Sequence, residues 1–135
     1  MDHQPMIRSY SELIQLPSFA ERLKYLQLFD EKYLSPRSLS PTFYKSLAWL
    51  SVRKEILIRD GYSDLGIRGL LIDSDIIVHH INPLEIQDIE EQNVDKLLDP
   101  ENLICVSYET HNKIHYKKAE IELLQERSAG DTKLW

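Results

Sequence analysis

The 135-residue sequence has one cysteine, four glycines and no long apolar run. A single cysteine, Cys105, cannot form an internal disulfide or build a cysteine-rich zinc site. We therefore expect Cys105 to act as a small buried hydrophobic residue. No stretch approaches the ~20 consecutive apolar residues that a membrane helix requires, so the sequence predicts no membrane-spanning helix. The first residues, MDHQPMIRSY, lack the basic and apolar regions of a secretory signal, so a cytoplasmic location is expected.

The residues that are present are typical of one globular domain with accessory helices: 42% are hydrophobic and 28% are charged. The formal net charge of −6 argues against a nucleic-acid partner, since Lys and Arg side chains neutralise phosphates in such complexes. However, residues 81–101 hold seven acids and one base, while the rest of the chain holds 15 of each. The acidity therefore belongs to one segment, which we expect to be a solvated loop or short helix without chemistry.

Helical patterns are found in the N-terminal half. Ser18 and Glu21 form a capping-box pattern before an amphipathic helix expected at about 18–32. The Ser- and Pro-rich stretch LSPRSLSP is typical of a linker, and it ends in an N-cap, Ser40, with Pro41 at the first position of a second helix. That helix is expected to end at about residue 59, and Gly61 follows it.

The C-terminal half has patterns of strands and one helix. The stretch GLLI, the turn residues 73–75 and the stretch DIIVHHI predict a β-hairpin within residues 67–81. A turn at residues 99–102 leads into a further strand at about 103–108. Strong helix formers then predict a last helix at about 110–127. The fold class is therefore α+β, with an N-terminal helical extension at residues 1–40 packed on a core at 41–128 and an irregular tail at 129–135.

Four of the five histidines lie between residues 79 and 115. His111 and His115 are four residues apart on the predicted last helix, a spacing that suits a shared metal ion. His79 and His80 are neighbours on a strand, where successive side chains point to opposite faces, so two different roles are expected. Each pair alone is more often a coincidence of surface or core histidines, but the combination of both pairs with an Asn-headed strand between them is more specific.

The residues VHHINPL…DPENLICVSYETHNKIHY resemble the HNH endonuclease family, whose ββα-metal core cleaves nucleic-acid phosphodiester bonds. The chain is most similar to small HNH proteins of bacterial viruses that lack a zinc ribbon. The resemblance is strongest over residues 79–116 and extends loosely to FYKSLAWLSVRKEILIRDGYSDLG and SFAERLKYLQL. It implies a β-hairpin plus helix as the nuclease core, within residues 41–128.

The resemblance also implies a role for each residue of the motif. His79 and His111 match metal ligands, and His80 matches the general base that activates water. Asn102 matches the asparagine that steadies the loop holding that base. His115 matches a further histidine that completes the metal shell or contacts phosphate. One divalent ion is implied: imidazole ligands suit Zn²⁺, Ni²⁺ or Mn²⁺, and Mg²⁺ is compatible if phosphate and water supply the remaining ligands.

One feature of many family members is missing from this sequence. They carry two Cys-x-x-Cys pairs around a structural zinc, and here residues 63–66 and 107–110 occupy those places. No structural zinc is therefore expected, and apolar packing of the N-terminal helices must support the core instead.

DNA is the expected substrate, with a 5′-phosphate and a 3′-hydroxyl as products. Six basic residues are candidates to grip its phosphates, although each one alone is more often simply solvated: Arg53, Lys54, Arg59, Lys113, Lys117 and Lys118. The phage relatives imply a role near genome packaging with the terminase, in the host cytoplasm. Two alternatives remain open: a non-catalytic DNA-binding or packaging accessory protein with a vestigial metal site, and a purely structural metal site.

Overall fold

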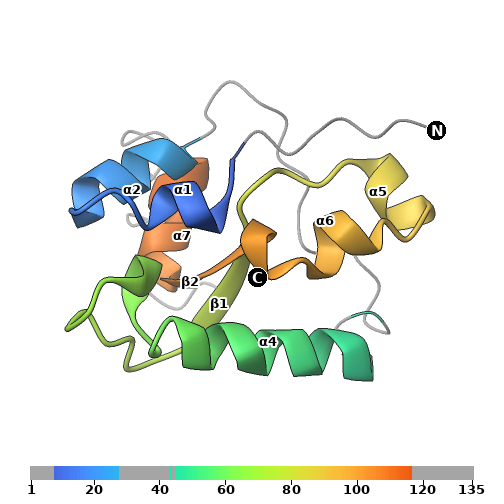
Figure 1. The fold of residues 1–135 in the computed structure, drawn as a ribbon, viewed down its shortest axis with the longest axis horizontal. Coiled ribbons are helices and arrows are strands. Elements are labelled where there is room, and N and C mark those ends of the chain that lie inside the picture. Colours follow the sequence, from blue (N-terminus) through green and yellow to red (C-terminus); the bar gives the residue numbers. More distant parts are fainter. Residues whose placement is uncertain (1–7, 28–42, 44, 117–135) are drawn as a thin grey trace, which may run out of the picture.

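A small antiparallel sheet lies at the centre of the computed structural model, which describes residues 8–27, 43 and 45–116 (Figure 1). Strand β1 (Ile76–His80) pairs with strand β2 (Leu103–Ser107), with Ile76 opposite Ser107 and His80 opposite Leu103. The structure is therefore a mixture of helices and a two-stranded sheet, as the predicted α+β class requires. No helix among the described residues has the length and apolar character needed to cross a membrane.

The hairpin predicted within residues 67–81 is wrong. In the described residues β1 pairs across the sheet with β2, and the preceding segment contributes only an isolated bridge between Ser63 and Leu71. Leu70 and Leu71 are 43% and 72% exposed, whereas β2 is buried at four of its five positions. Pairing with β2 removes more apolar surface from water, so it is the favoured arrangement although it joins segments distant in the sequence.

Helices cover both sides of the sheet. The short α1 (Tyr10–Leu13), which the patterns did not predict, and α2 (Phe19–Leu26) lie beside α7 (Tyr108–His115) on one side, while α4 (Leu47–Arg59) lies on the other (Figure 1). The acidic segment forms α5 (Ile86–Glu90) and α6 (Val94–Leu98), as the short-helix interpretation predicted. Two 3₁₀ turns complete the described elements, η2 (Asp64–Gly66) and η3 (Pro100–Asn102).

Serine caps set where four of the described helices begin, and the cap of α1 is Ser9. The predicted cap of α2 is confirmed, because the Ser18 hydroxyl accepts a hydrogen bond from the Glu21 amide at 3.1 Å. The caps of α4 and α7 are Ser46 and Ser107, so α7 begins two residues before the predicted start. The predicted cap at Ser40 and the Pro41 that follows it lie outside the described residues.

Two helices end earlier than the sequence patterns predicted. Helix α2 ends at Leu26, because Gln27 has an extended backbone with ψ of 130°. Helix α7 ends at His115, because Tyr116 is extended with φ of −124° and ψ of 145°. Strong helix formers around these positions did not determine the helix ends, so propensity alone was an insufficient guide. Residues 28–42 and 117–135, including the predicted tail, lie outside the described part of the chain.

The apolar core has two clusters, one on each face of the sheet. One contains Ile104 and Val106 of β2 with Leu13, Leu26 and other residues of the α1, α2 and α7 side. The other contains Val78, Leu103 and Cys105 with Trp49 and Ile56 of α4. Burial of each such aliphatic side chain contributes about 1.5–3 kcal/mol. The prediction that Cys105 is a buried hydrophobic residue is confirmed, since it is fully buried.

A half-buried carboxylate, that of Asp64, joins residues 63–66 to residues 107–110, the two segments that stand where many HNH proteins have Cys-x-x-Cys pairs. Asp64 Oδ2 accepts hydrogen bonds from the hydroxyls of Ser107 and Thr110, at 2.9 and 2.6 Å, and Asp64 Oδ1 accepts one from the Ser107 amide at 3.1 Å. Hydrogen bonds to an ionised acceptor are stronger than neutral ones, so Asp64 ties η2 firmly to the first turn of α7. We call this arrangement the Asp64 cross-link.

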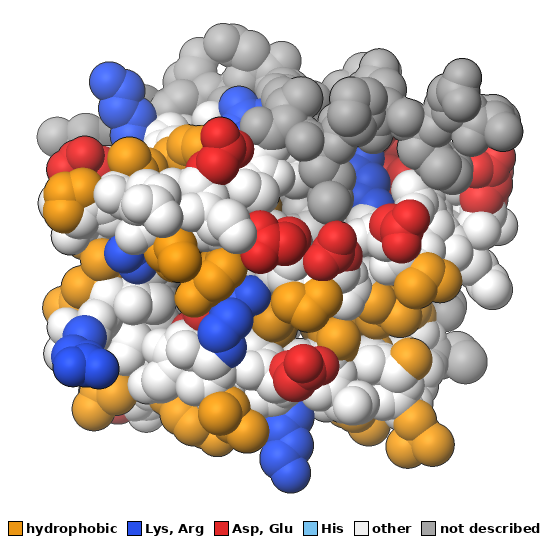
Figure 2. All heavy atoms as spheres, in the orientation of Figure 1, with side chains coloured by type: hydrophobic (Ala, Val, Ile, Leu, Met, Phe, Trp, Pro, Cys, Tyr) orange, Lys and Arg blue, Asp and Glu red, His pale blue; other side chains and the backbone are white. Residues whose placement is uncertain are grey.

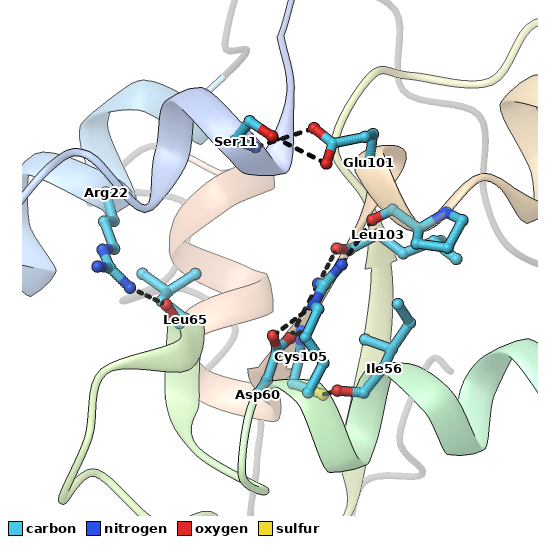
Figure 3. Close-up of polar contacts among 10 residues, drawn as sticks. Ser11, Arg22, Ile56, Asp60, Leu65, Glu101, Leu103 and Cys105 are labelled. Atoms are coloured by element: carbon cyan, nitrogen blue, oxygen red, sulfur yellow. Dashed lines mark hydrogen bonds and ion pairs between the residues drawn. The ribbon is translucent and has the colours of Figure 1, made fainter.

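The carboxylate of Asp60, which is buried, braces the centre of the sheet. Asp60 Oδ2 accepts a hydrogen bond from the Cys105 amide at 2.9 Å (Figure 3), and Asp60 Oδ1 pairs with Arg59 at 2.8 Å. Near it, the Ser11 amide and hydroxyl donate to the two carboxylate oxygens of Glu101, which ties α1 to η3 (Figure 3). Asp60 thus holds the residue that follows α4 against β2, and Glu101 holds α1 against the turn that precedes β2.

Candidate metal centre

Three histidines from two elements converge on one side of the sheet. His79 of β1 lies with its ring centroid 5.5 Å from that of His111 and 5.0 Å from that of His115, both on α7. The His111 and His115 rings are 4.4 Å apart, and their Nε2 atoms are 3.1 Å apart. Each residue offers one ring nitrogen, and these three nitrogens lie within 4.8 Å of one another.

Local structure explains why the three rings meet. Residues alternate along β1, so His79 shares its face with Ile77, which packs against the cluster of buried residues that contains Ile114 of α7. On α7 the four-residue spacing places His111 and His115 on one side of the helix. The structure therefore brings together the three histidines that were predicted to share a metal ion, His79, His111 and His115.

The cluster fits a divalent metal ion. Bonds of ~2.0–2.1 Å in a tetrahedral arrangement place ligand nitrogens about 3.3 Å apart, close to the 3.1 Å separation of the two α7 nitrogens. His79 Nε2 is buried and has no hydrogen-bond partner, a costly state that an ion at this place would relieve. Three imidazoles favour ions such as Zn²⁺ or Ni²⁺ over Mg²⁺. The chain thus has residues able to hold the predicted ion, and its identity is not fixed by them.

Burial keeps the three imidazoles neutral. Desolvation holds the pKa of His79 well below its ordinary value, and the nearby His115 and His111 lower it further. Desolvation also lowers the pKa of His111 to about 4 and, together with His111, that of His115 to about 3. A neutral imidazole has a lone pair available for a metal, so at neutral pH the cluster needs to release no proton before binding.

His80 is turned away from this cluster. Its ring stacks on Trp49 of α4, with centroids 5.8 Å apart and planes 20° from parallel, and its Nε2 lies 3.0 Å from the Leu97 carbonyl of α6. Burial lowers the pKa of His80 to about 4, against the raising effect of the Leu97 carbonyl; Lys96 lowers this pKa and Asp88 raises it. The expectation that the two adjacent histidines have different surroundings is confirmed.

Asn102 is fully buried and connects three segments. Its Nδ2 donates to the Lys96 carbonyl at 2.7 Å, and its Oδ1 accepts from the amide and the side chain of Asn82 at 2.8 and 2.7 Å. Its carbonyl also accepts a hydrogen bond from the Ile81 amide at 2.7 Å. Asn102 therefore holds the segment that follows His80, which is the kind of contact the resemblance implied.

Sequence reasoning did not single out Asn82, Asp64 or Trp49. Asn82 stands two residues after His80, within the stretch VHHINPL that carried the resemblance. Its position as a polar residue between Ile81 and Pro83 was the available signal. Asp64 was noted only as part of a segment that replaces a cysteine pair. Trp49 was part of the helix stretch FYKSLAWLSV, and no pattern connected it with His80.

The predicted phosphate contacts are in different situations. Lys54 and Lys113 are exposed. Arg53 is half-buried and donates to the Ile76 carbonyl at 3.1 Å. Arg59 donates four hydrogen bonds, two to Asp60 and one each to the carbonyls of Pro100 and Leu103, and its guanidinium lies 3.5 Å from the centre of the Tyr10 ring.

Arg59 therefore braces the fold in this structure, whereas the sequence suggested either a phosphate contact or a solvated side chain. A count of charges along the helix could not reveal this, because its partners come from residues 60, 100 and 103. Lys117 and Lys118 lie outside the described residues. The face in Figure 2 mixes acidic, basic and apolar side chains, and the described residues on it form no continuous basic area.

Stability is expected to fall as the pH drops from about 6.5 to 4. A histidine whose folded pKa is depressed takes up its proton more readily when the chain unfolds, so the unfolded state binds more protons throughout this window. Each such histidine contributes a slope of up to about 1.4 kcal/mol per pH unit to the free energy of unfolding. Urea denaturation of the metal-free protein at several pH values measures this slope.

His80→Phe, which retains an aromatic ring beside Trp49, is the control and is expected to reduce the slope. A free energy of unfolding that does not change with pH contradicts the prediction.

The four histidines thus have two kinds of surroundings. Three of them form a cluster that fits a metal ion, and the fourth, His80, is held by Trp49 and Leu97. The strands and the helix that carry them occur in the order β1, β2 and α7, with α5, α6 and η3 between the two strands. No family model, no curated protein and no solved structure matches the chain.

Proposed function

We propose that the protein is a divalent-metal-dependent HNH endonuclease that hydrolyses DNA phosphodiester bonds. The observation that carries the proposal is the convergence of His79, His111 and His115, the same three residues that the family resemblance marks as metal-binding. The order β1, β2 and α7 is also the order expected of a ββα-metal core. Asn102 adds support, because it holds the segment after His80 as the resemblance implies.

His79, His111 and His115 would hold the ion. Bound there, a divalent ion supplies positive charge that stabilises the negative charge developing on the phosphate oxygens. Catalytic metal sites commonly use three protein ligands and leave a position for water or substrate, and three is the number of histidines in this cluster. Because two of them sit on one helix turn, a change in the position of α7 would move both together.

His80 is the proposed general base. When its Nε2 donates to the Leu97 carbonyl, its Nδ1 carries the lone pair and can accept a proton from the attacking water. The depressed pKa keeps this ring neutral at cellular pH. A bound phosphate beside the ring would raise that pKa, since a nearby negative charge favours the protonated form, and so would strengthen the base when substrate is present.

The DNA-binding surface is proposed to include the exposed Lys54 and Lys113, with Arg53 as a further contact. The overall negative charge predicts weak non-specific binding to DNA. Because the resemblance is to phage proteins, we propose that the enzyme acts beside a terminase during genome processing.

A cleavage assay tests the proposal. Purified protein is incubated with supercoiled, branched and single-stranded DNA and with Mg²⁺, Mn²⁺, Ni²⁺ or Zn²⁺. We expect nicked or linear products with at least one ion, and none after chelation by EDTA. DNA that stays intact under every condition would contradict the nuclease function. Metal-dependent DNA binding without cleavage would instead support a packaging or DNA-binding accessory protein with a vestigial site.

One observation favours a second candidate, a structural metal site. His79 and His111 are only 6% and 2% exposed, and His80 faces the opposite side of the strand. A structural ion contributes directly to folding, so chelation would then unfold the protein. Circular dichroism before and after chelation separates the two candidates: the nuclease proposal expects a folded apoprotein that has lost activity.

A further inference from the structure

We infer that Asn82 is a positioning residue that acts through Asn102 to hold His80. The inference goes beyond the proposed function, and rests on it only where activity is measured. Asn82 is 4% exposed, and both polar atoms of its side chain are hydrogen-bonded. Its Nδ2 donates to Asn102 Oδ1 at 2.7 Å, and its own backbone amide donates to the same oxygen at 2.8 Å.

These contacts close a ring that begins and ends at His80. From Asn82, two residues after His80, hydrogen bonds lead to Asn102, whose Nδ2 donates to the Lys96 carbonyl at 2.7 Å. The next carbonyl along α6, that of Leu97, is the one that contacts His80 Nε2. His80 is thus fixed at its backbone through Asn82 and at its ring through α6, and Asn102 lies between the two.

The N-terminal segment holds Asn82 from the other side. The backbone amide of Arg8 donates to Asn82 Oδ1 at 3.1 Å, and the Arg8 carbonyl accepts from Asn82 Nδ2 at 2.8 Å. Nearby, the contact of Ser11 with Glu101 ties α1 to η3, which contains Asn102 (Figure 3). Segments on both sides of the Asn82–Asn102 pair are therefore anchored by the same N-terminal stretch.

Asn82→Asp is the informative variant. It keeps an oxygen that accepts from the Arg8 amide, but it replaces the nitrogen that donates to Asn102 Oδ1 and to the Arg8 carbonyl with a second oxygen, so two attractive contacts become repulsive. Asn82→Ala removes all three side-chain hydrogen bonds without adding charge, and it serves if the first variant does not fold. Ser18→Ala removes the cap of α2, which contributes no residue to this ring, and controls for a general loss of stability.

Trp49 provides a readout that does not depend on activity. Its ring stacks on His80, and the only other tryptophan in the sequence is Trp135, so a Trp135→Phe background isolates its fluorescence. In that background, His80→Ala calibrates the change in emission when the stacked ring is lost. We expect Asn82→Asp to change the Trp49 emission in the same direction, and Ser18→Ala to leave it unchanged.

The second readout is DNA cleavage, with metal affinity measured alongside. We expect Asn82→Asp to lower kcat by about 10–100-fold, the usual effect of losing a supporting contact, while KM and metal affinity stay close to wild type. Unchanged Trp49 emission in a folded Asn82 variant overturns the inference, and so does a wild-type kcat in a variant of an active enzyme. If the wild-type protein cleaves no DNA but the emission changes as expected, the nuclease proposal fails and the positioning role stands.

Discussion

Replacement of His80 by alanine is expected to lower the rate of DNA cleavage by about 100–10,000-fold, the range typical of losing a general base. The side chain contributes no ring nitrogen to the cluster of His79, His111 and His115, so metal affinity is expected to remain close to wild type. This separation of rate from metal binding distinguishes a base from a ligand. Single-turnover cleavage, with metal affinity measured by calorimetry on the same preparations, gives both quantities.

Two further variants sharpen this experiment. His80→Phe keeps an aromatic ring against Trp49 and removes only the nitrogens, so a low rate in this variant assigns the loss to proton transfer and not to packing. Trp49→Phe keeps His80 and weakens the stack, and it is expected to have a much smaller effect than His80→Ala. Cleavage by His80→Ala at the wild-type rate would exclude this histidine as the base.

His111→Ala is expected to weaken metal binding by more than 100-fold, since even the loss of residues behind a metal ligand costs about 10–100-fold. Cleavage should fall to background at a metal concentration that saturates the wild-type protein. Titration with Co²⁺, followed by its visible absorption, measures the affinity and reports the coordination. His111 is 2% exposed, so the stability of the apoprotein must be checked for each variant.

His111→Cys is the matched variant, because a thiolate is also a zinc and cobalt ligand. It is expected to retain more metal affinity than His111→Ala and to add a sulfur-to-metal absorption band to the Co²⁺ spectrum. Wild-type metal affinity in His111→Ala would show that the ion binds elsewhere, and the proposed centre would then be incorrect.

The histidine cluster was predicted in two steps: local rules paired His111 with His115 and separated His79 from His80, and the family resemblance brought His79 together with that pair. A four-residue spacing brings His111 and His115 together on any helix, and strand alternation separates His79 from His80 whichever strand pairs with β1. The cap at Ser18 was equally local. These rules need no knowledge of distant segments, so they could be applied to the sequence alone.

Other features depend on distant contacts and could not be predicted in this way. The pairing of β1 with β2 spans the whole acidic segment, and it competes with a local hairpin that the same patterns allowed. The partners of Arg59 come from turns far along the chain. The surroundings of His80 depend on α4 and α6, which converge only in the folded protein. Each outcome was decided by tertiary burial and not by local propensity.

The Asp64 cross-link has a consequence for how the protein could depend on its surroundings. It secures α7 to η2 with oxygen and nitrogen atoms alone, so neither thiol oxidation nor zinc starvation acts on this joint. If the cluster of His79, His111 and His115 holds the ion of the proposed reaction, removal of that ion would stop the reaction and leave this joint unchanged.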